Sequence, residues 1–370
     1  MNVMESIAQP RPTGNSVALD RRGAIDCDVH PALPSMSALL PYLDDYWREQ
    51  VVTRGIDGMD MNFFPHAVAA NCRPDWRLED GKPGSSLAHL QSHLLDPFGI
   101  RYAICNSLYG VHAVVNTEMA SAFCSALNEW MAREWLDRDP RLRASIMVAP
   151  HAPDLAAEEI EKRAGDKRFV QVLLFAMGEV PLGRRLHWPI FAAAEKHRMP
   201  VAIHSGTIYR HPLSWNGSPS YYMEDQFMQA HGAAAQVLSL LAGGVFKKFP
   251  ALKVVLTETG FTWLPEFMWG AHRMWRAMRN EIPWVDRAPL EILREHIRVT
   301  LQPTDAPPTP EDMTKVLEML GSDRMVLFSS DYPHWHFDGD KALPAGIPEP
   351  MLPKILVDNA LETYPRLGGN

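Results

Sequence analysis

Short apolar runs alternate along the chain with longer amphipathic stretches, and this pattern sets the first expectation about the fold. Eight of the runs are apolar enough to be covered on both faces, as strands of a parallel sheet are. These predicted strands lie at residues 24–29, 101–106, 143–148, 170–175, 201–204, 253–257, 297–301 and 325–329. The amphipathic stretches predict helices at 117–136, 155–164, 185–197, 224–248, 264–281 and 310–320. The order of the elements therefore predicts repeated βα units around a parallel sheet.

Eight strands in such units favour an α/β fold of the (β/α)8 TIM barrel type. An open doubly wound sheet is the alternative, but no Gly-rich phosphate-binding fingerprint follows the first strand. We expect one barrel domain at residues 24–370, preceded by a flexible arm at 1–23. Residues 31–99 are too many for a plain βα turn and include a helix-like stretch at 37–52, so they predict a lid-like insertion after strand 1.

Composition narrows the class of protein further. The chain has 370 residues, 46% of them hydrophobic and 22% charged, which is ordinary for a globular protein. A net charge of −8 without a Lys/Arg run argues against nucleic acid as a partner, and no apolar stretch approaches the roughly 20 residues that span a bilayer. The start of the chain lacks a secretory signal, and its four cysteines have no C-x-x-C spacing. We therefore expect a cytoplasmic protein with reduced thiols.

Ionisable residues stand where apolar strands end, and burial there is expensive unless something satisfies them. The strand ends read D-C-D-V-H, A-I-H-S-G, L-T-E-T-G and S-S-D-Y-P-H, and all of them would meet at one mouth of a barrel. Asp28 and His30 are two residues apart, so both side chains point to the same side of an extended strand and can reach one metal ion. Asp26 shares this side, and we interpret it as a helper that orients a ligand or caps the strand.

The other strand ends supply further candidate ligands. His204 alone would be read as a satisfied core histidine, but its position at a strand end favours metal ligation. Asp331 is interpreted as a ligand or general base rather than the cap of a turn. Glu258 has three possible roles: a structural carboxylate, a general base for metal-bound water, or a ligand that bridges to a second ion. His334, three residues after Asp331, is the best spare imidazole.

This set is rich in carboxylates, so iron or manganese is plausible beside zinc, as one or two ions. Carboxylates that face one another would repel unless divalent ions lay among them. For substrate contacts we single out His66 and Arg73 in the insertion, and Tyr209 and Arg210 after the fifth strand. An arginine can bind a substrate carboxylate through two hydrogen bonds.

The succession D-C-D-V-H, A-I-H-S-G, G-G-V-F-K-K-F-P-A-L-K-V-V-L-T-E-T-G and F-S-S-D-Y-P-H-W resembles the amidohydrolase-related family that includes aminocarboxymuconate-semialdehyde decarboxylase. The resemblance runs from Ala24 to about Leu361 and implies a metal-bearing (β/α)8 barrel. It implies that His30, His204 and Asp331 are ligands.

Two positions depart from that family's pattern. Asp28 takes the place of the first histidine of the usual His-x-His pair, and Glu258 stands where the decarboxylases carry a catalytic histidine. The second departure weakens a decarboxylase assignment, because the acid–base residue that such an enzyme would use is missing.

The leading functional hypothesis is therefore hydrolysis of an amide, lactone or ester bond in a small organic substrate by metal-activated water. A di-metal iron or manganese monooxygenase that uses oxygen is an alternative, and a non-oxidative decarboxylase is a second one. A non-catalytic partner subunit is disfavoured because the ligand positions are intact. We expect a homo-oligomer or a pairing with a related barrel subunit.

Overall fold

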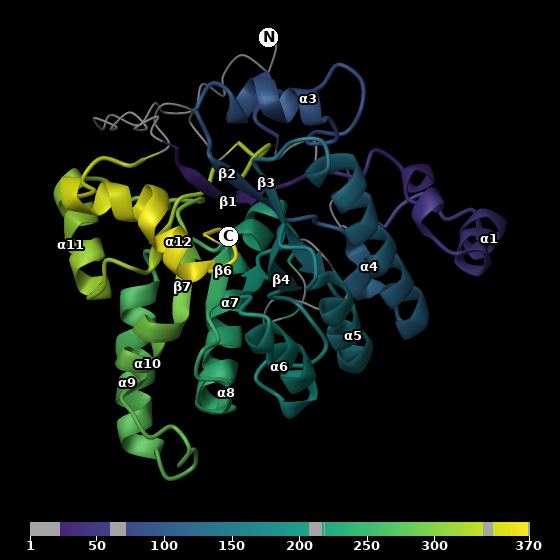
Figure 1. Ribbon diagram of the computed structural model, residues 1–370. Coiled ribbons are helices and arrows are strands. Elements are labelled where there is room, and N and C mark those ends of the chain that lie inside the picture. Colours follow the sequence, from purple (N-terminus) through teal and green to yellow (C-terminus); the bar gives the residue numbers. More distant parts are fainter. Residues whose placement is uncertain (1–22, 60–71, 207–216, 218, 336–342, 369–370) are drawn as a thin grey trace.

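The computed structural model describes residues 23–59, 72–206, 217, 219–335 and 343–368, and it is a barrel of eight parallel strands (Figure 1). The strands pair in the order in which they occur in the sequence. They are β1 (Ile25–Val29), β2 (Tyr102–Cys105), β3 (Leu142–Met147), β4 (Phe169–Phe175), β5 (Val201–His204), β6 (Val254–Thr257), β7 (Ile297–Thr300) and β8 (Val326–Leu327). Each of the eight predicted runs contains or overlaps one of these strands.

Backbone hydrogen bonds between β1 with its next residue, His30, and the segment that directly follows β8 close the barrel. Cys27 N donates to Phe328 O at 3.0 Å, and Asp331 N donates to Asp28 O at 3.1 Å. His30 N donates to Tyr332 O at 2.8 Å. The predicted (β/α)8 barrel is thus confirmed, and the open doubly wound alternative is wrong.

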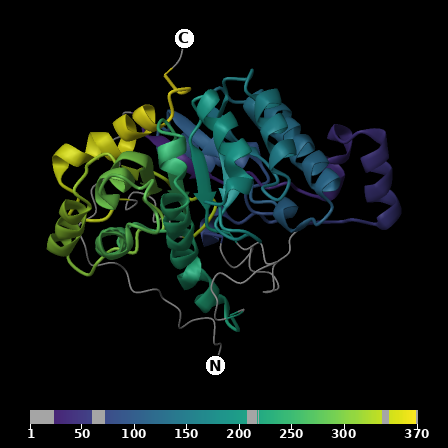
Figure 2. The ribbon, with the colours of Figure 1, turned by 90° about the horizontal axis from the view of Figure 1, so that it is seen from below.

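Helices surround the barrel in both views (Figures 1 and 2). They are α1 (Asp45–Arg54), α3 (Leu87–Leu90), α4 (Thr117–Met131), α5 (Pro153–Arg163), α6 (Trp188–Lys196), α7 (Tyr222–Ala242), α8 (Val245–Lys248), α9 (Leu264–Met278), α10 (Pro289–His296), α11 (Pro310–Leu320) and α12 (Asn359–Thr363). The helix expected at 224–248 is two helices, because Gly244 adopts a φ of 73° between α7 and α8. Helices α3, α10 and α12 are not among the helices predicted from the sequence.

The insertion between β1 and β2 has two parts that lie in different places. Helix α1 begins at Asp45, after Asp44 caps it by accepting a hydrogen bond from Trp47 N, and it lies at the outer side of the molecule in both views. Cys72 pairs with His334 in an isolated antiparallel bridge. The insertion therefore lies, at Cys72, against the segment after β8, beside the strand ends.

A small apolar cluster fills the inside of the barrel. Ile25, Val170 and Val255 come from β1, β4 and β6, on different sides of the barrel, and they belong to one cluster of buried side chains. Tyr364 and Leu367, near the end of the chain, pack on the same cluster. Among the described residues, no helix combines the length and apolar character needed to cross a bilayer.

Candidate metal centre

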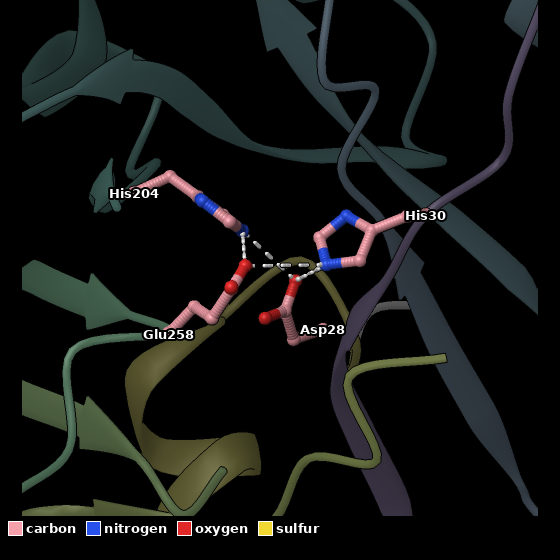
Figure 3. A group of neighbouring side chains, drawn as sticks. All are labelled: Asp28, His30, His204 and Glu258. Carbon is pink, nitrogen blue, oxygen red and sulfur yellow. Dashed lines mark ion pairs between the residues drawn. The ribbon is translucent and has the colours of Figure 1, made fainter. Parts of the chain in front are cut away.

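Four side chains from three strand ends point toward one another at the mouth of the barrel (Figure 3). Asp28 and His30 come from the end of β1, His204 is the last residue of β5, and Glu258 directly follows β6. All four are buried or nearly so. Parallel strands place their carboxyl ends at one edge, which explains why residues so far apart in sequence meet here.

The distances within this group suit a single ion. His30 Nε2 lies 3.3 Å and His204 Nε2 lies 3.4 Å from Asp28 Oδ1. Glu258 Oε2 lies 3.6 Å from His204 Nε2 and 3.9 Å from His30 Nε2. Donors at about 2.1 Å from a tetrahedral ion are roughly 3.4 Å apart. The group thus surrounds a space of about the size that a divalent ion needs.

Asp331 and His334 lie beside this group, on the segment after β8. Asp331 Oδ1 is 2.9 Å from His30 Nε2 and 2.7 Å from His334 Nδ1. His334 Nδ1 is also 3.9 Å from Glu258 Oε2. The structure therefore brings together all six residues that the sequence singles out as candidate ligands, in two overlapping groups that share His30 and Glu258.

Within the described part of the chain, two polar atoms in the first group have no hydrogen-bond partner. These atoms are Asp28 Oδ2 and His204 Nε2, and both are buried. The other ring nitrogen of His204, Nδ1, is close to the carbonyl of Ser205. Buried polar atoms are rarely left unpaired in proteins, because each one costs about 1–3 kcal/mol. A divalent metal ion fits these two atoms, which have no hydrogen bond, and the mixed set of carboxylates and imidazoles around them.

The electrostatics point the same way. Burial, and then the charge of Asp331, raises the pKa of Glu258 well above its ordinary value. Burial opposes the charged form of His30, but the nearby Asp28 and Asp331 carboxylates raise its pKa well above the usual range. Without an ion, protons would offset the negative charge of the site. A bound cation replaces such protons, so metal binding should release them.

The two carboxylates that follow β6 and β8 share an unusual backbone conformation. Glu258 and Asp331 each have a φ of 58°, in the left-handed region that residues other than glycine seldom adopt. Strain of this kind costs on the order of 1–3 kcal/mol and is concentrated at functional sites. The strained backbone at Glu258 thus favours a role for this residue in the functional site over a purely structural role.

Asp26 contacts the backbone of the two strands that close the barrel. Its Oδ1 atom accepts hydrogen bonds from Asp28 N at 3.1 Å and Ser330 N at 3.0 Å. Burial raises the pKa of Asp26 to about 7. These contacts agree with its interpretation as a helper that orients the ligand strand.

The sequence does not single out three buried polar residues behind the site: Asn106, Ser145 and Gln171. Asn106 follows β2 and contacts Asp28 and His30. Polar residues within otherwise apolar strands, such as Gln171 in F-V-Q-V-L-L-F, are the signal that marks them.

Of the predicted substrate contacts, only Arg73 lies in the described part of the chain. Its guanidinium binds Asp75 at 2.7 and 2.8 Å and lies 4.4 Å from the centre of the Trp76 ring. The proposed clamp on a substrate carboxylate is therefore engaged with Asp75. His66, Tyr209 and Arg210 lie outside the described residues.

A closed (β/α)8 barrel with carboxylates and imidazoles at its mouth defines a class of metal-dependent enzymes. The family model described as Amidohydrolase matches residues 25–366. The chain therefore belongs to the amidohydrolase family, and it is an enzyme of that family.

Several known proteins resemble this chain. Gamma-resorcylate decarboxylase from Rhizobium sp. (strain MTP-10005) is 28% identical over 260 residues, which cover 66% of this chain and 76% of the relative. 6-Methylsalicylic acid decarboxylase from Penicillium expansum is 27% identical over 260 residues, covering 68% of this chain and 77% of the relative.

Solved structures share the fold. 5-Carboxyvanillate decarboxylase LigW from Sphingomonas paucimobilis has a TM-score of 0.66 at 19% identity, covering 93% of this chain and 99% of that one. A dihydroxybenzoic acid decarboxylase from Polaromonas sp. JS666, with bound manganese and 2-nitroresorcinol, has a TM-score of 0.65 at 19% identity, covering 94% and 98%.

These comparisons correct the leading functional hypothesis. Hydrolysis of an amide, lactone or ester is wrong, because the related enzymes are named as decarboxylases. The hydrolase expectation gave too much weight to the missing histidine at position 258. The divalent metal expected from the ligand set agrees with the manganese named for related structures.

Proposed function

We propose that this enzyme is a metal-dependent, non-oxidative decarboxylase of a small aromatic acid that carries a hydroxyl group beside its carboxylate. The acids in the names of its relatives are hydroxybenzoic acids of this kind. The observation that carries the metal-dependent part is the cage of Asp28, His30, His204 and Glu258, with its orphaned atoms on Asp28 and His204.

In the proposed reaction the bond between the ring carbon and the carboxylate breaks, carbon dioxide leaves, and the ring carbon takes up one proton. The equation balances without an oxidant. A divalent ion held by these residues would supply positive charge that stabilises the negative charge of the substrate. The residues of the chain must hold that ion, exclude water and deliver the proton.

We assign the ion to Asp28, His30, His204 and Glu258. In this assignment position 258 has a different role from the one that the family resemblance implies. The resemblance places a catalytic histidine there, whereas Glu258 is assigned as a metal ligand. Its distances of 3.6 and 3.9 Å from the two imidazoles support this role.

The proton is assigned to Asp331 and His334. The two are in hydrogen-bond contact at 2.7 Å, and Asp331 is completely buried whereas 12% of the His334 side chain is exposed. The pair therefore connects the interior of the site with its opening. The imidazole that is missing at position 258 would then be supplied from the segment after β8.

Carbon dioxide release tests the proposed reaction. The manganese-loaded enzyme is incubated without oxygen with 2,6-dihydroxybenzoate, 6-methylsalicylate or 5-carboxyvanillate, and both carbon dioxide and the loss of the acid are measured. We expect equimolar carbon dioxide and decarboxylated phenol from at least one acid, and none from the His204→Ala variant. A fully metallated, folded enzyme that releases no carbon dioxide from any of them would rule the proposal out.

A further inference from the structure

Asn106 is bound to all three residues at the end of β1. Its side-chain Nδ2 donates to Asp28 Oδ1 at 2.8 Å, and its main-chain oxygen contacts His30 Nδ1 at 2.9 Å. Its main-chain nitrogen donates to Val29 O at 2.7 Å. Asn106 itself is fully buried. A single residue thus contacts two proposed metal ligands on the side away from the ion.

The contact with His30 determines which ring nitrogen can face the ion. A carbonyl oxygen only accepts hydrogen bonds, so Nδ1 of His30 must carry a hydrogen and donate it to Asn106. The lone pair of the neutral ring is then on Nε2, the atom that faces Asp28 and Glu258. A hydrogen bond of this kind fixes both the tautomer and the orientation of a ligating histidine.

Two further residues determine how the Asn106 amide is oriented. Asn106 Oδ1 accepts from Ser145 Oγ at 2.5 Å and from Gln171 Nε2 at 3.0 Å. The same Gln171 nitrogen donates to Ser145 Oγ at 2.8 Å. The reverse orientation would bring Oδ1 against the Asp28 carboxylate. Strands β3 and β4 therefore hold the amide with its N–H toward Asp28.

This network is poorly suited to a purely stabilising role. All three of its residues are buried, and polar groups in such a position contribute little net stability even when they are hydrogen-bonded. In addition, Gln171 Oε1 is buried without a partner in the described structure. Apolar side chains would fill the same interior at lower cost. Stability alone therefore does not explain the network, and we look for its role at the metal site.

We propose that Asn106 is a positioning residue of the metal centre, which aligns Asp28 and His30 for the ion and is itself aligned by Ser145 and Gln171. This inference rests on the assignment of Asp28 and His30 as ligands in the proposed function. It does not depend on the identity of the substrate. Outer partners of this kind affect metal affinity by about 10- to 100-fold.

The test is the Kd for Mn²⁺, measured by titration of the metal-free protein. Asn106→Leu removes the side-chain donor at similar size, and Asn106→Asp places a second carboxylate against Asp28. We expect both to weaken Mn²⁺ binding by about 10- to 100-fold. Asn128→Leu is the matched control: Asn128 is also buried, but it bonds Met147 and Glu159 outside the site. It should lower the Tm and leave the Kd for Mn²⁺ unchanged.

Milder variants keep the test decisive if the Asn106 variants do not fold. Ser145→Ala and Gln171→Leu each free one side of the Asn106 amide and should weaken Mn²⁺ binding several-fold. An unchanged Kd in folded Asn106→Leu overturns the proposal, as do unchanged values in both milder variants or an equal loss in Asn128→Leu. A wild-type enzyme that binds Mn²⁺ but releases no carbon dioxide overturns the reaction alone.

Discussion

His334 Nδ1 lies 2.7 Å from Asp331 Oδ1, and the same carboxylate oxygen is 2.9 Å from His30 Nε2. Asp331 therefore joins the proposed metal ligands to an imidazole at the edge of the site. In the proposed reaction, the pair of Asp331 and His334 provides the proton, whereas Glu258 is a ligand of the ion.

Asp331→Asn and His334→Gln should then lower kcat by roughly a hundredfold or more, because each removes a partner in proton transfer. Both variants should keep a metal content close to that of the wild type. Elemental analysis of the purified variants, alongside kcat, checks this prediction. Loss of the metal from folded Asp331→Asn would instead make Asp331 a ligand, as the family resemblance implies.

Glu258→Gln should weaken metal binding, unlike the Asp331 and His334 variants, which should keep the metal. It removes a charged ligand, so we expect the Kd for Mn²⁺ to rise by more than about a hundredfold, beyond the usual effect of an outer partner. Glu159→Gln is a matched control, because the Glu159 side chain is 6% exposed, against 11% for Glu258, but it pairs with Arg163 on the outside of the barrel. Normal Mn²⁺ affinity in Glu258→Gln would refute the assignment of Glu258 as a metal ligand.

His30→Ala and His204→Ala should each lose most of the metal and all measurable activity, since each removes a nitrogen donor of the cage. Circular dichroism and metal analysis of the same samples separate this effect from misfolding. A folded variant that keeps its full metal content would show that the ligand is misassigned.

His112 predicts a pH dependence of stability that is independent of the metal. Burial, and then the charge of His151, lowers the pKa of His112 to about 3, while its ordinary value is 6.5. The unfolded chain therefore takes up a proton below pH 6.5 that the folded protein refuses, so stability falls as the pH falls. The loss from pH 7 to pH 5 should be about 2 kcal/mol.

The variant His112→Gln isolates this contribution. Denaturant unfolding at pH 7 and pH 5 should show a smaller loss of stability in the variant than in the wild type. An identical loss in both proteins would mean that His112 does not control it.

The positions of the strands could be predicted because each strand is buried on both faces and leaves a local apolar run. Asp28 and His30 could be predicted as candidate ligands for the same reason, because an ionisable residue at the end of an apolar run is easy to recognise. Helix α10 was missed because it has only 8 residues, about two turns, although its buried residues follow the spacing of an amphipathic helix. Helix boundaries depend on caps and on packing, which a periodic pattern does not contain.

The hydrogen-bond network behind the site and the class of reaction could not be predicted from the sequence, for different reasons. Asn106, Ser145 and Gln171 come from three strands, and their meeting depends on register that no local pattern encodes. The reaction class depends on the shape of the pocket and, in our proposal, on Glu258 acting as a metal ligand in place of the catalytic histidine. A missing histidine therefore counted against decarboxylation, although His334 stands close by in space.

Decarboxylation in D₂O under anaerobic conditions, followed by NMR of the aromatic product, tests the proposed reaction most directly. We expect one carbon dioxide per acid consumed and one deuteron at the ring carbon that carried the carboxylate. Consumption of the acid without carbon dioxide, or a product whose vacated carbon holds no deuteron, would contradict it.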